Sequence, residues 1–70
     1  MYREIIGRIY DALCERGYNP IRQLGDFLLS GDPTHITPYR DARILCGSID
    51  REAFLGELLR SYLGGGAQNM

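Results

Sequence analysis

The segment Gly17-Tyr18-Asn19-Pro20 separates two amphipathic stretches and carries the signals that end one helix and begin the next. Gly17 suits the left-handed position that follows the last turn of a helix. Asn19 can accept a hydrogen bond from a free backbone N–H as an N-cap, and Pro20 fits the first helical position because its missing donor would have no partner there. The segment therefore predicts two helices joined by a short turn.

Amphipathic helices are predicted on both sides of this turn. Residues 2–16 place their apolar side chains on one arc of a helical wheel, namely Tyr2, Ile5, Ile6, Ile9, Tyr10, Ala12 and Leu13. Residues 20–30 repeat this spacing with Ile21, Leu24, Phe27 and Leu28. The turn Gly31-Asp32-Pro33 then closes the second helix and begins a loop.

A third helix is predicted after that loop. Thr37-Pro38 repeats the pattern of a cap followed by proline, so we expect the helix to begin there and to end near Gly47-Ser48. Its apolar side chains group on one side, and they are Tyr39, Ala42, Leu45, Cys46 and Ile49.

A fourth helix is predicted over residues 51–63. Asp50 is a strong N-cap candidate, and Ile49 and Phe54 have the spacing of a hydrophobic staple. The apolar arc of this helix is broad, with Phe54, Leu55, Leu58, Leu59, Tyr62 and Leu63.

These signals predict a small all-α domain of four helices with short connections over residues 1–63. Residues 64–70 begin with three glycines and are expected to form a flexible tail. Hydrophobic residues make up 44% and charged residues 24% of the chain, which is typical of a folded domain and not of a disordered one. No apolar run approaches the roughly 18 residues of a membrane span, so we expect no membrane insertion.

The length of seventy residues limits how stable a single copy can be. A chain of this size hides only about 60% of its unfolded surface, and such chains usually need a disulfide, a metal or a partner. We expect a homodimer, with its interface on the helices that have the widest apolar arcs. The interface candidates are Ile5, Ile9, Leu55, Leu58, Leu59 and Tyr62.

Cys14 and Cys46 are the two cysteines of the chain, and their number allows one disulfide. Residues 1–4 do not lead into a continuous apolar region, so we expect no signal peptide and a cytoplasmic protein with reduced thiols. The two cysteines and His35 cannot complete a four-ligand zinc site, so no metal is expected.

Catalytic patterns are weak. Cys14 or Cys46 could pair with His35 as nucleophile and base, but Cys14 lies on the polar side of its predicted helix and Cys46 on the apolar side of another. No pair of acids is isolated in an apolar setting that would raise a pKa. Gly64-Gly65-Gly66 has neither the strand nor the lysine of a phosphate-binding loop. We therefore expect no catalytic residue and no cofactor.

All eight basic residues are arginines, whose planar guanidinium can bind a carboxylate or a phosphate through two hydrogen bonds. Arg40 and Arg43 lie away from the main apolar arc of the third predicted helix. Arg51 lies in the first turn of the fourth helix, where a cation opposes the helix dipole, so it needs a partner. The partner is either an acid of this chain, such as Asp41 or Glu52, or an acidic or phosphorylated group on another protein. Arg40, Arg43 and Arg51 are therefore the candidate partner-binding residues.

Two other functions fit a helical domain of this size. In the first, the third helix with Arg40 and Arg43 reads nucleic acid as part of a helix-turn-helix; nine acids against eight arginines, with no basic stripe, count against it. In the second, the chain is a structural subunit without a regulated step.

The sequence also resembles the IreB family of small bacterial regulatory phosphoproteins. The resemblance covers roughly residues 5–63. It is carried by Gly17-Tyr18-Asn19-Pro20, Gln23, Leu28-Leu29-Ser30-Gly31-Asp32-Pro33, Ile36, Asp41-Ala42-Arg43, Arg51-Glu52, Glu57-Leu58 and Ser61-Tyr62-Leu63.

The resemblance implies a non-enzymatic regulatory adaptor that is helical, cytoplasmic and homodimeric. It also implies that a membrane Ser/Thr kinase with extracellular PASTA domains phosphorylates the protein. Downstream regulatory proteins are its expected partners, and the pathway controls cell-wall synthesis and cephalosporin resistance. In some relatives this control acts through proteolysis of the enzyme that commits UDP-N-acetylglucosamine to peptidoglycan.

Two features of the chain depart from the family pattern. Relatives usually carry a phosphorylated threonine in a segment before the first helix, whereas the threonines here are Thr34 and Thr37 and neither matches it. Relatives also tend to have basic residues where this chain has Gly47-Ser48, so we expect any partner contact made there to be weaker.

Overall fold

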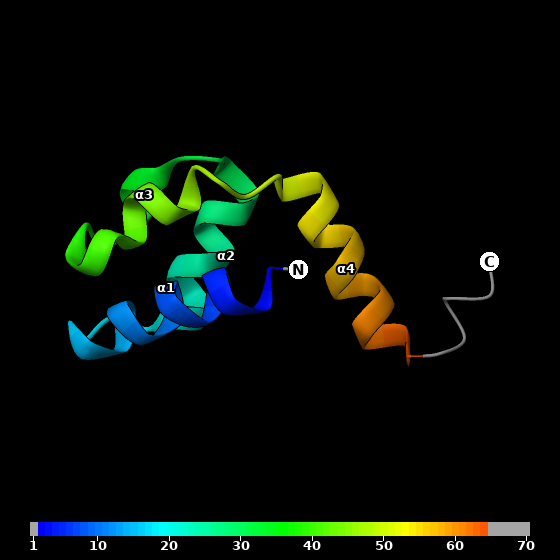
Figure 1. The fold of residues 1–70 in the computed structure, drawn as a ribbon, viewed down its shortest axis with the longest axis horizontal. Helices are drawn as coiled ribbons and strands as arrows, with labels where there is room; N and C mark the ends of the chain where they lie inside the picture. The colour runs from blue at the N-terminus through cyan, green and yellow to red at the C-terminus, as the bar shows by residue number, and fades with distance from the viewer. Residues whose placement is uncertain (1, 65–70) are drawn as a thin grey trace.

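The computed structural model describes residues 2–64, and these residues form helices joined by short connections (Figure 1). The four α-helices are α1 (Arg3–Glu15), α2 (Pro20–Ser30), α3 (Ala42–Cys46) and α4 (Arg51–Leu63). Two one-turn 3₁₀ helices, η1 (Pro33–His35) and η2 (Tyr39–Asp41), lie between α2 and α3. The all-α, four-helix prediction is confirmed for the described residues. Apart from Gly64, the predicted tail lies outside them.

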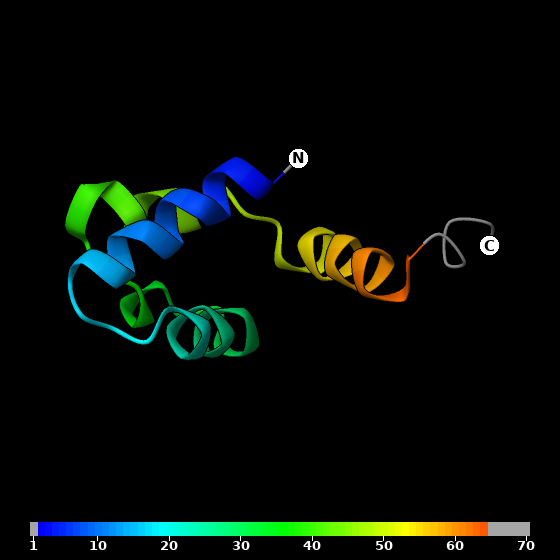
Figure 2. The ribbon, with the colours of Figure 1, turned by 90° about the horizontal axis from the view of Figure 1, so that it is seen from below.

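The core is built from one face of α1, one face of α2, the connection between α2 and α3, and α3. Ile9, Ala12 and Leu13 of α1 are fully buried, and so are Ile36 and Ala42. These residues, together with Leu24, Phe27, Cys46, Ile49 and Phe54, form one hydrophobic cluster. In both ribbon views α4 lies to one side of the body formed by α1, α2 and α3 (Figures 1 and 2).

The predicted caps are confirmed by their hydrogen bonds. Asn19 Oδ1 accepts from the backbone N–H of Arg22 at 3.1 Å, and Asp50 Oδ1 accepts from Ala53 at 3.2 Å. Gly17 has φ +80°, in the left-handed region expected of it. Local sequence signals therefore set the ends of α1, α2 and α4.

The start of the third helix was predicted wrongly. The chain forms η2 after Pro38, and within it Arg40 (φ 53°) and Asp41 (φ 61°) adopt left-handed conformations, so α3 begins only at Ala42. Such backbone costs about 1–3 kcal/mol per residue unless the surroundings hold it. Next to this backbone, the Tyr39 hydroxyl and the Arg40 guanidinium contact Glu15 of α1. Arg40 consequently precedes α3 and is not part of it.

None of the helices in the described part of the chain has the length and apolar character needed to cross a membrane.

Two glycines offer a matched test of backbone conformation. Neither Gly17 nor Gly25 would place an added Cβ near another atom, but only Gly17 has a positive φ. We expect Gly25→Ala, inside α2, to raise the free energy of unfolding by about 0.5–1 kcal/mol. Gly17→Ala should lower it by about 1 kcal/mol, because a side chain strains the left-handed backbone. Urea unfolding followed by circular dichroism measures both, and shifts of the same sign would contradict the explanation.

Candidate functional site

Arg51 binds the C-terminal end of α2. Its Nη1 donates a hydrogen bond to the carbonyl of Leu28 at 2.9 Å. The C-terminal end of a helix dipole is negative, so this contact offsets the unfavourable position of a cation in the first turn of α4. The partner within the chain is thus a backbone carbonyl, where the sequence suggested Asp41 or Glu52.

Gly31 makes this contact sterically accessible. It ends α2 with φ +76°, and a Cβ built there would lie 2.7 Å from Nη2 of Arg51. A side chain at this position would therefore meet two obstacles, the left-handed backbone and the guanidinium. The Gly31–Arg51 contact connects α4 to the body of the protein.

Tyr2 and Phe54 form the second connection to α4. Their rings meet edge-to-face with centroids 5.7 Å apart, and the Tyr2 hydroxyl accepts a hydrogen bond from the backbone N–H of Asp50 at 3.4 Å. Phe54 is the buried residue of α4. The first turns of α4 are therefore fixed to the body.

Arg43 joins α3 to the connection that precedes it. Its Nε donates to the carbonyl of Ile36 at 2.9 Å, and Ile36 is fully buried. Within residues 2–64 the two terminal nitrogens of Arg43 have no hydrogen-bond partner. Arg43 thus fixes the core locally and keeps donors for another group.

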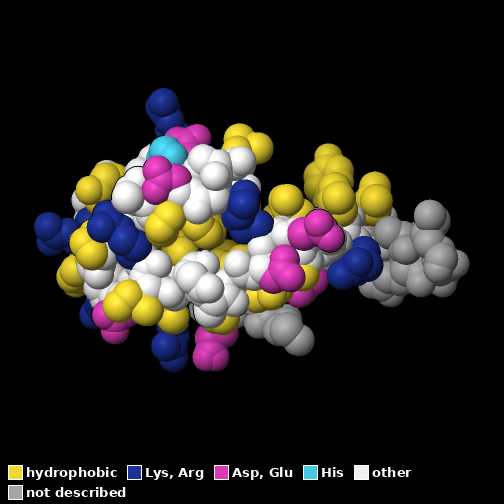
Figure 3. All heavy atoms as spheres, turned by 90° about the horizontal axis from the view of Figure 1, so that it is seen from above, with side chains coloured by type: hydrophobic (Ala, Val, Ile, Leu, Met, Phe, Trp, Pro, Cys, Tyr) yellow, Lys and Arg dark blue, Asp and Glu magenta, His cyan; other side chains and the backbone are white. Residues whose placement is uncertain are grey.

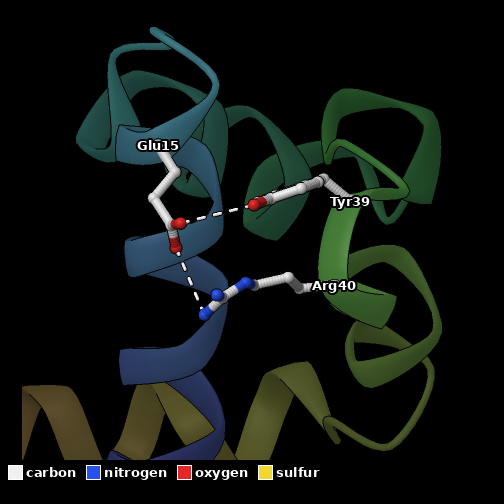
Figure 4. Close-up of polar contacts among 3 residues, drawn as sticks. All are labelled: Glu15, Tyr39 and Arg40. Carbon is white, nitrogen blue, oxygen red and sulfur yellow. Dashed lines mark hydrogen bonds and ion pairs between the residues drawn. The ribbon is translucent and has the colours of Figure 1, made fainter.

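Arg40 belongs to a cluster on the surface of α1 (Figure 4). Arg40 Nη1 lies 3.4 Å from Glu15 Oε2, and the Tyr39 hydroxyl donates to Glu15 Oε1 at 3.3 Å. The guanidinium groups of Arg40 and Arg16 lie 5.7 and 5.3 Å from the centre of the Tyr39 ring. An exposed ion pair contributes at most about 1 kcal/mol to the free energy of unfolding. The main effect of the cluster is therefore to place η2 against α1.

The three candidate arginines therefore contact different parts of the chain: Glu15 for Arg40, Ile36 for Arg43 and Leu28 for Arg51. The nucleic-acid alternative required a third helix that carries both Arg40 and Arg43. The observed α3 has five residues and begins after Arg40.

The candidate interface residues divide into two groups. Ile9 is fully buried within one copy, and Ile5 is half-buried against the core, so both belong mainly to the protomer. The residues on α4 are exposed, with 60% of Leu59 and 89% of Tyr62 accessible. The complete exposed set on α4 is Leu55, Leu58, Leu59, Tyr62 and Leu63, which we call the α4 apolar face. Figure 3 shows hydrophobic side chains gathered over this part of the molecule.

A groove of about 380 Å³ runs between α1 and α4, beside this face. Its walls are formed by Arg3, Ile6, Gly7 and Tyr10 of α1 and by Phe54, Glu57, Leu58 and Ser61 of α4. Leu58 belongs to both the groove and the α4 apolar face, so the groove adjoins that face.

The two cysteines differ in their surroundings. Burial raises the pKa of the Cys46 thiol to about 11, so this thiol is protonated at neutral pH and packs in the core. Cys14 is exposed, and both cysteines are free thiols. Among the described residues, no three His, Cys, Asp or Glu side chains are grouped as metal ligands.

The sequence model of the IreB regulatory phosphoprotein family matches residues 1–64, which include every helix described above. The chain belongs to this family. Membership makes it a regulatory phosphoprotein by family.

The structure gives a role to several residues through which the sequence resembles IreB proteins. Gly31 accommodates Arg51, Asp32 caps η1 by accepting from the backbone N–H of Thr34 at 2.9 Å, and Arg43 holds Ile36. Asp32 was expected to be a cap or loop acid, which its bond to Thr34 confirms, whereas the pairings of Gly31 with Arg51 and of Arg43 with Ile36 were not predicted. The sequence offered two signals here: a glycine, Gly31, at the end of a helix and a cation, Arg51, at the start of another. Neither signal identifies the residue that lies opposite it.

Proposed function

We propose that this IreB-family chain is a non-enzymatic regulatory adaptor in the cytoplasm, which acts as a homodimer and is phosphorylated by a PASTA-domain Ser/Thr kinase. In this proposal the phosphorylated and unphosphorylated forms bind different downstream regulatory proteins. Cell-wall synthesis and cephalosporin resistance are the outputs, with regulated proteolysis as the route. The family match over residues 1–64 is the observation that carries the proposal.

The α4 apolar face supports the homodimer. A helix on a protein surface normally turns its apolar stripe towards a core, whereas α4 buries Phe54 alone and exposes five large apolar side chains. Contiguous exposed apolar surface of this kind marks an interaction site.

A second copy is the partner that α4 suits best. Two copies of α4 in antiparallel orientation form a self-complementary, two-fold interface. A chain of seventy residues usually needs such a partner to supplement its own small core.

Arg43 and Arg51 are proposed to bind an acidic or phosphorylated group on the downstream partner. Arg51 is exposed and uses Nη1 for Leu28, and Arg43 uses Nε for Ile36, so both retain donors. Arg40, exposed at the edge of the Glu15 cluster, is the third candidate.

Capture of partners from the source bacterium tests this function. Tagged wild-type protein should retain a regulatory partner, and the retained amount should change when the kinase is deleted. Arg43→Ala and Arg51→Ala should reduce capture while circular dichroism shows folded protein. Arg22→Ala, an exposed arginine on α2, is the matched control. Equal capture by all variants, or identical partners with and without the kinase, would contradict the proposal.

A further inference from the structure

The two threonines of the chain lie three residues apart, and the structure separates them clearly. Thr37 is 8% exposed, and its hydroxyl accepts a hydrogen bond from the backbone N–H of Tyr39 at 3.2 Å. Thr34 is exposed, as are its neighbours Asp32 and Pro33. A kinase can therefore reach Thr34 without unfolding the core, whereas Thr37 is enclosed.

We propose that Thr34 is a phosphoacceptor of this protein and that its phosphate opens the cap of η1. The proposal rests on the proposed function, because it requires the Ser/Thr kinase. In the reaction Thr34 Oγ1 forms a bond to the γ-phosphorus of Mg·ATP. The bond from that phosphorus to the bridging oxygen breaks and ADP leaves, while the hydroxyl proton passes to the catalytic base of the kinase.

The location of Thr34 favours its presentation to a kinase. It lies between α2 and α3, in the connection over residues 31–41. The local structure around it is η1, a single turn of 3₁₀ helix. Two backbone hydrogen bonds close this turn, from His35 N–H to the carbonyl of Asp32 at 3.3 Å and from Ile36 N–H to the carbonyl of Pro33 at 3.0 Å. A single turn of 3₁₀ helix opens more easily than a long helix. The acceptor can therefore extend into a kinase active site while α1, α2 and the core remain folded.

Asp32 is the group that senses the modification. One oxygen of its carboxylate, Oδ1, accepts both the backbone N–H of Thr34 at 2.9 Å and the Thr34 hydroxyl at 2.7 Å. These bonds hold the pKa of Asp32 below its usual range, and the charges of His35 and Arg43 act in the same direction. Phosphorylation removes the hydroxyl donor and places a nearly dianionic group beside an ionised carboxylate. The two groups repel, and the cap opens.

Arg43 is the cation that can receive the phosphate. Its charge already acts on Asp32, and its terminal nitrogens have no partner among the described residues. A guanidinium binds phosphate through two parallel hydrogen bonds. The Thr34 phosphate would thus exchange the bond to Asp32 for one to Arg43, where it would compete with the acidic group proposed for the downstream partner.

The consequence extends to the connection between α2 and α3. Gln23 of α2 donates to the carbonyl of His35 at 2.9 Å, and the fully buried Ile36 follows directly. Gly31, which accommodates Arg51, lies three residues before Thr34. A change in η1 therefore acts next to the contact that fixes α4.

Phosphorylation in vitro followed by mass spectrometry tests the inference. The full chain is incubated with Mg·ATP and the catalytic domain of the PASTA-domain kinase from the source organism. Trypsin cleaves after Arg22 and Arg40 and releases residues 23–40, in which Ser30, Thr34, Thr37 and Tyr39 are the hydroxyl residues. Fragmentation of this peptide should place one phosphate on Thr34.

Three variants sharpen the test. Thr34→Ala should remove the phosphate from this peptide, and Thr34→Ser should retain it. Ser30→Ala should also retain it, although the Ser30 hydroxyl accepts from the backbone N–H of Asp32 at 3.0 Å. Circular dichroism confirms that each variant is folded. Phosphate on another residue, with Thr34 unmodified, would overturn this inference and leave the kinase-substrate proposal standing. A chain that takes no phosphate at any residue would overturn both.

Discussion

Leu59→Asp is expected to convert the protein from a dimer into a less stable monomer. Leu59 lies in the α4 apolar face and is 60% exposed in one copy. Burial of a leucine contributes about 1.5–3 kcal/mol, and an aspartate at the same place would have to lose its hydration without a partner. The dissociation constant should therefore rise by about two orders of magnitude or more, as measured by sedimentation equilibrium.

Leu29→Asp is the matched control for this experiment. Leu29 is 87% exposed on α2, so the same substitution introduces the same charge outside the proposed interface. The control should remain dimeric and keep the stability of the wild-type protein. Equal dissociation constants for Leu59→Asp and Leu29→Asp would exclude α4 as the interface.

Gly31→Ala is expected to be the most destabilising of the glycine substitutions. Its φ of +76° alone costs a non-glycine residue about 1–3 kcal/mol. The added Cβ would also lie 2.7 Å from the Arg51 guanidinium, which must move and release the carbonyl of Leu28. Urea unfolding should show a larger loss of stability than for Gly17→Ala, where no atom lies near the added Cβ.

A double-mutant cycle separates the two causes of this loss. In an Arg51→Ala background the guanidinium is absent, so Gly31→Ala should cost only the backbone strain. The cost of Gly31→Ala should then be smaller than in the wild-type protein, by about 0.5 kcal/mol or more. Additive costs would show that Arg51 does not pack against Gly31 in solution.

The fold could be predicted from the sequence wherever short-range signals determine it. Asn19 and Asp50 cap helices that begin one residue later, and Gly17 ends the first helix, because all three act on neighbouring backbone groups. The start of α3 could not be predicted in this way. Arg40 and Asp41 adopt left-handed backbone there, and the guanidinium of Arg40 lies beside Glu15 in a distant part of the chain.

The candidate site was predictable only in part, for the same physical reason. The sequence indicated that Arg51 needs a partner, but the carbonyl of Leu28 is 23 residues away and a carbonyl carries no sequence signal. A helical wheel also places both Ile9 and Leu59 on an apolar face, so it predicts the same burial for both. Tertiary packing buries Ile9 completely and leaves Leu59 exposed.

The mass of the wild-type protein in solution tests most directly whether the α4 apolar face binds a second copy. Light scattering at micromolar concentration, with circular dichroism on the same sample, measures mass and folding together. The account predicts helical protein with a mass of twice 7.9 kDa. A stable, helical species with a mass of 7.9 kDa at this concentration would contradict it.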